Sequence, residues 1–192
     1  MIVQKNEARP LGLKGAFVLS PMVFRDERGD FTKTYTRQIL KSIGVEPYFC
    51  EEYVSYSKMN VLRGLHFQTG GHAQAKLVRC IKGEIFDVIV DLRKSSPTFG
   101  KWAGVALSEE NMLSIYVPRG FAHGFMALGA TNAVLYKADN DYSPENEGGL
   151  FYADPMLGIS WPHAPAITLS EKDSKWPGFA ACAKFDYSSP RK

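Results

Sequence analysis

The sequence is poor in the residues and runs that mark exported, membrane-spanning or disordered chains. Only 3 of its 192 residues are cysteine, and no two of them have the Cys-x-x-Cys spacing of zinc knuckles and redox motifs. Gly and Pro together account for 28 of the 192 residues, about 15%, which is well below the roughly 25–30% typical of low-complexity chains. No apolar run reaches the roughly 18 residues that cross a bilayer, and the charged Lys5 and Glu7 interrupt any secretory leader. We therefore expect a cytoplasmic protein without membrane contact, forming one domain over residues 1–192.

An excess of charge of one sign is lacking as well. The chain has 23 Lys or Arg and 20 Asp or Glu, a formal net charge of +3, without a long basic run or a helix-turn-helix pattern. Nucleic acid is therefore not an expected partner. A few basic residues in one cavity can still bind a small anion, because a net charge near zero does not prevent local clustering.

Short apolar stretches recur along the chain and are separated by turn-forming pairs such as Gly70-Gly71, Lys82-Gly83 and Ser96-Pro97. The predicted strands cover residues 16–19, 53–56, 76–81, 85–92, 102–107, 112–117, 121–127 and 133–136. This spacing predicts an antiparallel sandwich or barrel. One amphipathic helix is predicted over Thr36–Ile43, with Gly44 as its terminator. The fold class is therefore all-β with one or two short helices.

The predicted strand at 85–92 has two different faces. Phe86, Val88 and Val90 form an apolar face, and the alternate positions mix Ile85 and Ile89 with Asp87 and Asp91. The mixed face is a candidate wall for a cavity.

Histidine is scarce, and the four that occur are His66, His72, His123 and His163. His72 follows two glycines and His163 lies between prolines, so both are interpreted as solvated loop residues. His66 and His123 lie in apolar strand settings, each with an arginine three or four residues before it. A lone strand histidine is most often a hydrogen-bonded core residue, but two of them that face one barrel mouth together with Lys76 would form a candidate site.

The pattern Pro118-x-Gly120-x-x-His123 resembles the second sequence motif of the cupin superfamily, whose fold is a double-stranded β-helix or jelly roll. Metal-binding cupins take most of their ligands from a first motif with His-x-His and a following Glu. The matching place here is His66-x-Gln68, and no acidic residue follows closely. An amide is a poor substitute for imidazole at a transition metal, so we expect no metal and no other cofactor.

Longer segments make the resemblance more specific. They are DERGDF at 26–31, VLRGLHFQ at 61–68, residues 74–102, YVPRGFAHGF at 116–125, the pair Tyr136 and Tyr142, DPMLGISWP at 154–162 and LSEKD at 169–173. In this order, over about residues 14–177, they resemble the dTDP-4-dehydrorhamnose 3,5-epimerase family. The resemblance implies a jelly roll that forms a homodimer with strands extended across the subunit boundary. It also implies a nucleotide-diphosphate sugar as substrate, and a place in deoxysugar biosynthesis.

The implied reaction removes protons from the carbons beside the 4-keto group of a 6-deoxy sugar and returns protons from the opposite face. It needs a base, an acid and a positive group at the developing enolate oxygen. By resemblance His66 is the base and Asp173 orients it. Tyr136 is the acid, since a phenol is protonated at neutral pH. Lys76 is the cation at the sugar 4-oxygen.

The resemblance also assigns residues that bind the rest of the substrate. Arg63 is a candidate for the diphosphate, because a guanidinium binds phosphate through two bonds. Arg28, donated by the partner subunit, is a second candidate. His123 and Tyr142 resemble further contacts to diphosphate and sugar, and Phe31 resembles a contact to the nucleobase.

The chain departs from the family pattern at two places. Family members commonly have Gln-Asp-Asn before the RGLH segment, and this chain has Glu51-Glu52-Tyr53, so Glu51 and Tyr53 are candidate nucleotide contacts. Lys33 occupies a position that is usually acidic. The base of the substrate, dTDP, CDP or GDP, therefore stays open at this point, as does inversion at C3, C5 or both.

Two other functions remain to be distinguished. A metal-dependent cupin oxygenase or isomerase would contain stoichiometric iron, manganese or zinc on elemental analysis. A non-catalytic sugar-binding jelly roll would need neither an acid nor a base, so the joint presence of His66, Tyr136 and Asp173 argues against it.

Overall fold

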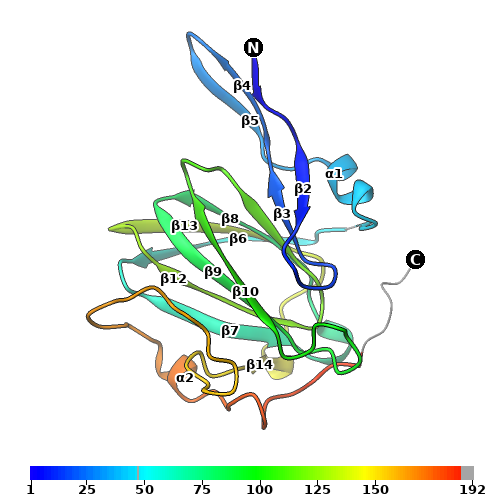
Figure 1. Cartoon of the computed structure of the whole chain (residues 1–192), viewed down its shortest axis with the longest axis vertical. Coiled ribbons are helices and arrows are strands. Elements are labelled where there is room, and N and C mark those ends of the chain that lie inside the picture. Colours follow the sequence, from blue (N-terminus) through cyan, green and yellow to red (C-terminus); the bar gives the residue numbers. More distant parts are fainter. Residues whose placement is uncertain (47, 187–192) are drawn as a thin grey trace.

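The computed structural model describes residues 1–46 and 48–186, and its body consists of two antiparallel sheets (Figure 1). The six-stranded sheet has the order β2 (Glu7–Pro10), β3 (Phe17–Ser20), β11 (Ser114–Val117), β8 (Lys76–Lys82), β13 (Thr131–Ala138) and β6 (Glu51–Lys58). The five-stranded sheet has the order β10 (Trp102–Ser108), β9 (Glu84–Asp91), β12 (Phe121–Ala127), β7 (Leu62–Gln68) and β14 (Glu147–Gly149). The prediction of an all-β jelly roll is confirmed.

The main core lies between the two sheets. Val78 and Val134 of the six-stranded sheet pack in one cluster with Ile85, Ile89 and Phe125 of the five-stranded sheet. Apolar side chains on both inner faces are buried, and this burial is the main favourable term in the free energy of folding.

Both faces of β9 are covered. The mixed face predicted from the sequence turns toward the core, where Asp87 is buried together with Ile85 and Ile89. The apolar face packs under the C-terminal segment, with Val88 and Val90 in a second cluster that includes Leu150 and Leu157. The carboxyl group of Asp87 is therefore buried in the core, on the inner face of the sheet that contains both strand histidines.

The predicted helix is present as α1 (Arg37–Ser42). The Thr36 side chain caps its N-terminus by accepting a hydrogen bond from the Ile39 N–H, and Gly44 follows its C-terminus with φ +74°. A second helix, α2 (Glu171–Ser174), begins after Ser170, whose side chain accepts from the Asp173 N–H. Two short 3₁₀ turns occupy Gly70–His72 and Pro144–Asn146. Neither described helix is long and apolar enough to cross a bilayer.

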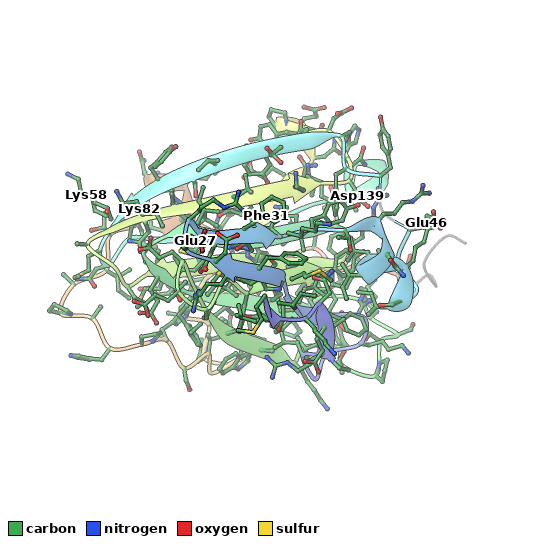
Figure 2. All side chains as sticks on the ribbon, turned by 90° about the horizontal axis from the view of Figure 1, so that it is seen from above. Glu27, Phe31, Glu46, Lys58, Lys82 and Asp139 are labelled. Atoms are coloured by element: carbon green, nitrogen blue, oxygen red, sulfur yellow. The ribbon has the colours of Figure 1, made fainter. Side chains whose placement is uncertain are left out.

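A third, small sheet projects from the body (Figure 1). It contains β1 (Ile2–Gln4), β4 (Met22–Asp26) and β5 (Gly29–Lys33), and the last two strands form a hairpin. In the view from above, Glu27 and Phe31 lie on this hairpin (Figure 2). The Phe31 side chain is 63% exposed, which is unusual for a large apolar residue.

Candidate active site

The two strand histidines lie on neighbouring strands of the five-stranded sheet. His66 of β7 and His123 of β12 are directly paired across the antiparallel ladder. The other two histidines are exposed, as the sequence predicts. The fold therefore brings together the two histidines that the sequence analysis singled out.

His66 is held by a buried carboxylate from a distant part of the chain. Its Nε2 lies 2.5 Å from Oδ1 of Asp173, which helix α2 presents beneath β7. The Gly64 N–H and the Trp176 indole N–H also donate to this carboxylate, at 3.4 and 3.1 Å. Burial alone would raise the pKa of Asp173, but the hydrogen bond from His66 and these other donors outweigh it and lower the pKa. An ionised carboxylate can only accept hydrogen bonds, so Asp173 accepts one from the Nε2–H of His66. The lone pair of the neutral imidazole is then on Nδ1.

His123 has a carboxylate partner of its own. Its Nε2 lies 3.0 and 2.9 Å from the two oxygens of Asp87, and both side chains are almost fully buried. Burial raises the pKa of Asp87, against the opposing effects of His123 and of the charge on Lys76. The alternating pattern of β9 had marked Asp87 as a cavity residue, but not as the partner of a histidine.

Lys76 of β8 is a cation whose charge interacts with that of Asp87. Burial lowers the pKa of its ammonium group to about 8, although the charges of Glu147, Asp87 and Glu51 act in the opposite direction. The group is therefore largely protonated at neutral pH and becomes neutral in mildly alkaline solution.

Tyr136 lies on β13 and is only 6% exposed. Its hydroxyl is 3.5 Å from Oγ of Ser55, and its ring stands edge-on to His123 at a centroid distance of 6.1 Å. The ring of Tyr53 stacks on it at 4.8 Å with an interplanar angle of 15°. Burial raises the pKa of the Tyr136 phenol well above its ordinary value, so the phenol is protonated at neutral pH.

A cavity of about 340 Å³ opens beside these residues, which is within the usual range for small-molecule sites. It is lined by Glu51, Tyr53, His66, Phe67, Gln68, Gln74, Lys76, Tyr142 and Glu147. Five predicted site residues thus share one cavity wall. Asp173, His123 and Tyr136 are not among the lining residues of this cavity. Asp173 contacts His66, Tyr136 contacts Tyr53, and His123 contacts Tyr136.

The sequence analysis missed an acidic residue in this wall. Glu147 accepts a hydrogen bond from the Tyr142 hydroxyl at 2.7 Å and is bridged by the Lys172 ammonium group at 2.8 Å. Burial would raise the pKa of Glu147, but the bonds from Lys172 and Tyr142 lower it. Glu147 follows a turn and carries no strand periodicity, so no local pattern marks it.

Gln68 and Gln74 use their amides to shape the cavity. The Gln68 amide nitrogen donates to the carbonyls of His72 and Asp141 at 2.8 and 3.1 Å, and its oxygen accepts from the Ser143 N–H at 2.6 Å. Gln68, which stands at the position of a metal ligand in metal-binding cupins, is thus hydrogen-bonded to backbone groups. Within residues 1–46 and 48–186, no three His, Cys, Asp or Glu side chains are grouped as metal ligands.

Three predicted substrate contacts lie outside this wall. Arg63 is exposed and donates to Ser57 Oγ and to the Tyr56 carbonyl, both at 3.0 Å. Arg28 pairs with Asp26 at 2.7 Å, and its side chain is 85% exposed. Phe31 lies on the same projecting hairpin as Arg28 (Figure 2).

Comparisons with known proteins agree on one family. The family model described as dTDP-4-dehydrorhamnose 3,5-epimerase matches residues 10–181. The dTDP-4-dehydrorhamnose 3,5-epimerase of Salmonella typhimurium is 52% identical over 161 residues, covering 83% of this chain and 88% of the relative.

Solved structures are similar over nearly the whole chain. The Legionella pneumophila dTDP-6-deoxy-D-glucose-3,5-epimerase, in complex with dTDP-4-keto-L-rhamnose, is 36% identical with a TM-score of 0.92, covering 96% of this chain and 100% of that one. A 3'-monoepimerase from Streptomyces bikiniensis, in complex with dTDP-quinovose, is 31% identical with a TM-score of 0.84, covering 90% and 87%.

Proposed function

The chain belongs to the family of dTDP-4-dehydrorhamnose 3,5-epimerases, and from that premise we propose how its own residues invert the carbons beside the sugar ketone. It is an isomerase that acts on a nucleotide-linked 4-keto-6-deoxy sugar in deoxysugar biosynthesis. The observation that carries the proposed roles is the hydrogen bond between His66 and Asp173 at the wall of the cavity that also holds Lys76.

His66 is the base in this proposal. Its Nε2–H is directed to Asp173, so the lone pair on Nδ1 is available to take a proton from a carbon next to the ketone. The carboxylate stabilises the imidazolium that forms, and it holds the ring in one orientation. The two electrons of the broken C–H bond pass into the enolate.

Lys76 stabilises the enolate. Its ammonium group is partly desolvated, so its attraction to a developing oxyanion is stronger than it would be in water. Loss of one such donor typically reduces transition-state stabilisation by about 3 kcal/mol.

Tyr136 returns a proton to the opposite face of the carbanion. Its phenol is protonated at neutral pH, and the hydroxyl of Ser55 lies beside it. After the transfer, the tyrosinate of Tyr136 takes a proton from water, and the imidazolium of His66 releases its proton to water. No oxidant, reductant or cofactor enters the balance.

The remaining substrate contacts are proposed for the dTDP moiety. Glu51, Tyr53 and Tyr142 line the same cavity, and Arg63 and His123 lie on the adjacent strands β7 and β12. Arg28 and Phe31 would act across a homodimer, since their hairpin projects away from its own body (Figure 1). The protein would work in the cytoplasm, as a dimer.

The test is incubation with the dTDP-linked 4-keto-6-deoxy sugar in heavy water, followed by NMR. The wild type is expected to incorporate deuterium at C3 and C5 and to form inverted product. The His66→Ala variant should lose both while leaving the fold intact. Exchange in His66→Ala at the wild-type rate would contradict the assignment of the base. Thermal shifts with dTDP, CDP, GDP and UDP would rank the bases, because a ligand that binds only the folded state stabilises it.

A further inference from the structure

Tyr53 lines the cavity and packs directly beside Tyr136. The two residues are direct partners in the β6–β13 ladder, and their rings stack at 4.8 Å and 15°. Tyr53 lines the cavity and is 38% exposed, whereas Tyr136 is 6% exposed and is not among the described residues that form the wall. The ring of Tyr53 therefore packs directly against the residue proposed as the acid.

We infer that Tyr53 is a positioning residue that holds the Tyr136 phenol in its proton-donating orientation and thereby sets how often a carbanion is inverted rather than returned to its original configuration. This inference rests on the proposed function, since it requires Tyr136 to be the acid.

The surroundings of Tyr136 support this role. Its ring is held on one face by Tyr53 and along an edge by His123, and the weak contact between its hydroxyl and Ser55 is 3.5 Å long. A single long hydrogen bond fixes a phenol poorly. The stacked ring is therefore one restraint on its orientation, beside the buried core residues that pack around Tyr136, and such aromatic pairs contribute beyond the area they bury.

Tyr53 itself stays neutral in this position. Burial, with a smaller effect from the charge of Glu51, raises the pKa of its phenol to about 12. A neutral ring keeps its stacking geometry throughout the working pH range.

Inversion and return can be separated by experiment because they use different faces of the sugar. The base can give a solvent deuteron back to the face it came from, which yields labelled substrate of unchanged configuration. Inverted product requires the acid on the other face. The ratio of labelled, uninverted substrate to inverted product thus reports how well the acid is positioned, independently of the rate of proton removal.

The variants are Tyr53→Leu, which removes the ring, and Tyr53→Phe, which keeps it. Tyr56→Leu is the matched control, because Tyr56 is on the same strand with its side chain 74% exposed. In heavy water, at saturating substrate, we expect Tyr53→Leu to raise the ratio by about two- to tenfold, the range that an aromatic pair contributes. Tyr53→Phe and Tyr56→Leu should both retain the wild-type ratio. If Tyr53→Leu does not fold, Tyr53→Val supplies the same loss of the ring with a residue favoured in strands.

The outcomes separate the two proposals. An unchanged ratio in Tyr53→Leu, with the wild type active, overturns the positioning role alone. A raised ratio in Tyr53→Phe also overturns it, because the hydroxyl rather than the stacked ring would then be responsible. Absence of exchange in the wild type would contradict the proposed function, and this inference with it.

Discussion

His66 and His123 are paired across adjacent antiparallel strands, and each ring nitrogen Nε2 is bonded to its own buried carboxylate. The two carboxylates come from different places: Asp173 from helix α2 and Asp87 from the inner face of β9. For His66, whose partner Asp173 has a lowered pKa, the bond directs the Nε2 proton into the protein, so that Nδ1 is the nitrogen left to act. The pairs differ in exposure, because His66 reaches the cavity wall and His123 is buried behind it.

The first prediction concerns Asp173, the carboxylate partner of His66. Asp173→Asn keeps the shape of the side chain but removes the charge that orients His66 and stabilises its imidazolium. We expect kcat to fall by about 10²–10⁴, the usual contribution of acid–base catalysis, with the fold retained. Steady-state kinetics and circular dichroism would measure this.

Asp154→Asn is the matched control for this change. Asp154 is also a buried carboxylate, but it accepts backbone N–H bonds from Met156 and Phe179 in the C-terminal segment. The Asp154→Asn variant should have a lower free energy of unfolding but the same kcat as the wild type. A loss of less than about tenfold in Asp173→Asn would show that the carboxylate is not needed to orient the base.

The second prediction is a pH dependence set by Lys76. Burial lowers the pKa of this ammonium group to about 8, so raising the pH through that value removes the charge that stabilises the enolate. We expect kcat/KM to fall on the alkaline side with an apparent pKa near 8. A profile that stays flat to pH 10 would exclude Lys76 as the essential cation.

The Asp87→Asn variant is a second test of the Lys76 ammonium group, because it removes a neighbouring charge. The negative charge of Asp87 favours the protonated form of Lys76, so its removal should move the alkaline limb to lower pH. Glu84→Gln is the control, since Glu84 lies on the same strand but is exposed. The alkaline limb of the pH profile should shift to lower pH in Asp87→Asn and stay in place in Glu84→Gln.

The strand pattern of this chain could be predicted from sequence because apolar alternation is a local property. Every predicted strand is present, and helix α1 begins and ends within one residue of its predicted bounds. Strands β1, β2, β4, β5 and β14 were not predicted, and β7 was marked only as the strand setting of His66, without bounds. The N-terminal strands are short and largely exposed, so they lack a buried face that would produce a regular apolar period.

The site was only partly predictable, because its details depend on contacts between distant segments. The partnership of Tyr53 with Tyr136 follows from the register of β6 against β13, and no local pattern specifies that register. Trp176 is a further example. Its ring stands edge-on to that of His66 of β7, far away in the sequence, and the isolated LSEKD segment does not indicate this contact.

The third prediction concerns the packing that supports Trp176. A Cβ added at Gly149 would come within 2.1–2.4 Å of the indole ring, so Gly149→Ala must displace the ring. We expect a loss of about 1–3 kcal/mol in the free energy of unfolding, together with lower kcat, because Trp176 also donates to Asp173. Urea unfolding and kinetics would measure both. Gly71→Ala, at a site with no atom within 4 Å, should leave both values unchanged, and an unaffected Gly149→Ala would contradict the packing argument.

The last prediction concerns the projecting hairpin. If Arg28 completes the site of a partner subunit, then Arg28→Ala and His66→Ala damage different chains of one active site. In a mixed dimer, one site then carries both lesions and the other carries neither. Random mixing of equal amounts makes half of the dimers mixed, so about one quarter of the wild-type activity should return. Each variant alone should be strongly impaired. Co-expression with two different tags, followed by purification of the mixed species, would raise the expected value to about one half.

The control pairs two lesions that lie within one chain. His66 and Asp173 are hydrogen-bonded in the same subunit, so every site of a mixed His66→Ala and Asp173→Asn dimer carries one of the two changes. That mixture should recover nothing beyond the residual activity of its parents. Recovery with Arg28→Ala but not with Asp173→Asn would assign the hairpin to the neighbouring site. Equal failure of both mixtures would assign Arg28 to the site of its own chain, or to no site, and the exposed hairpin would then need another explanation.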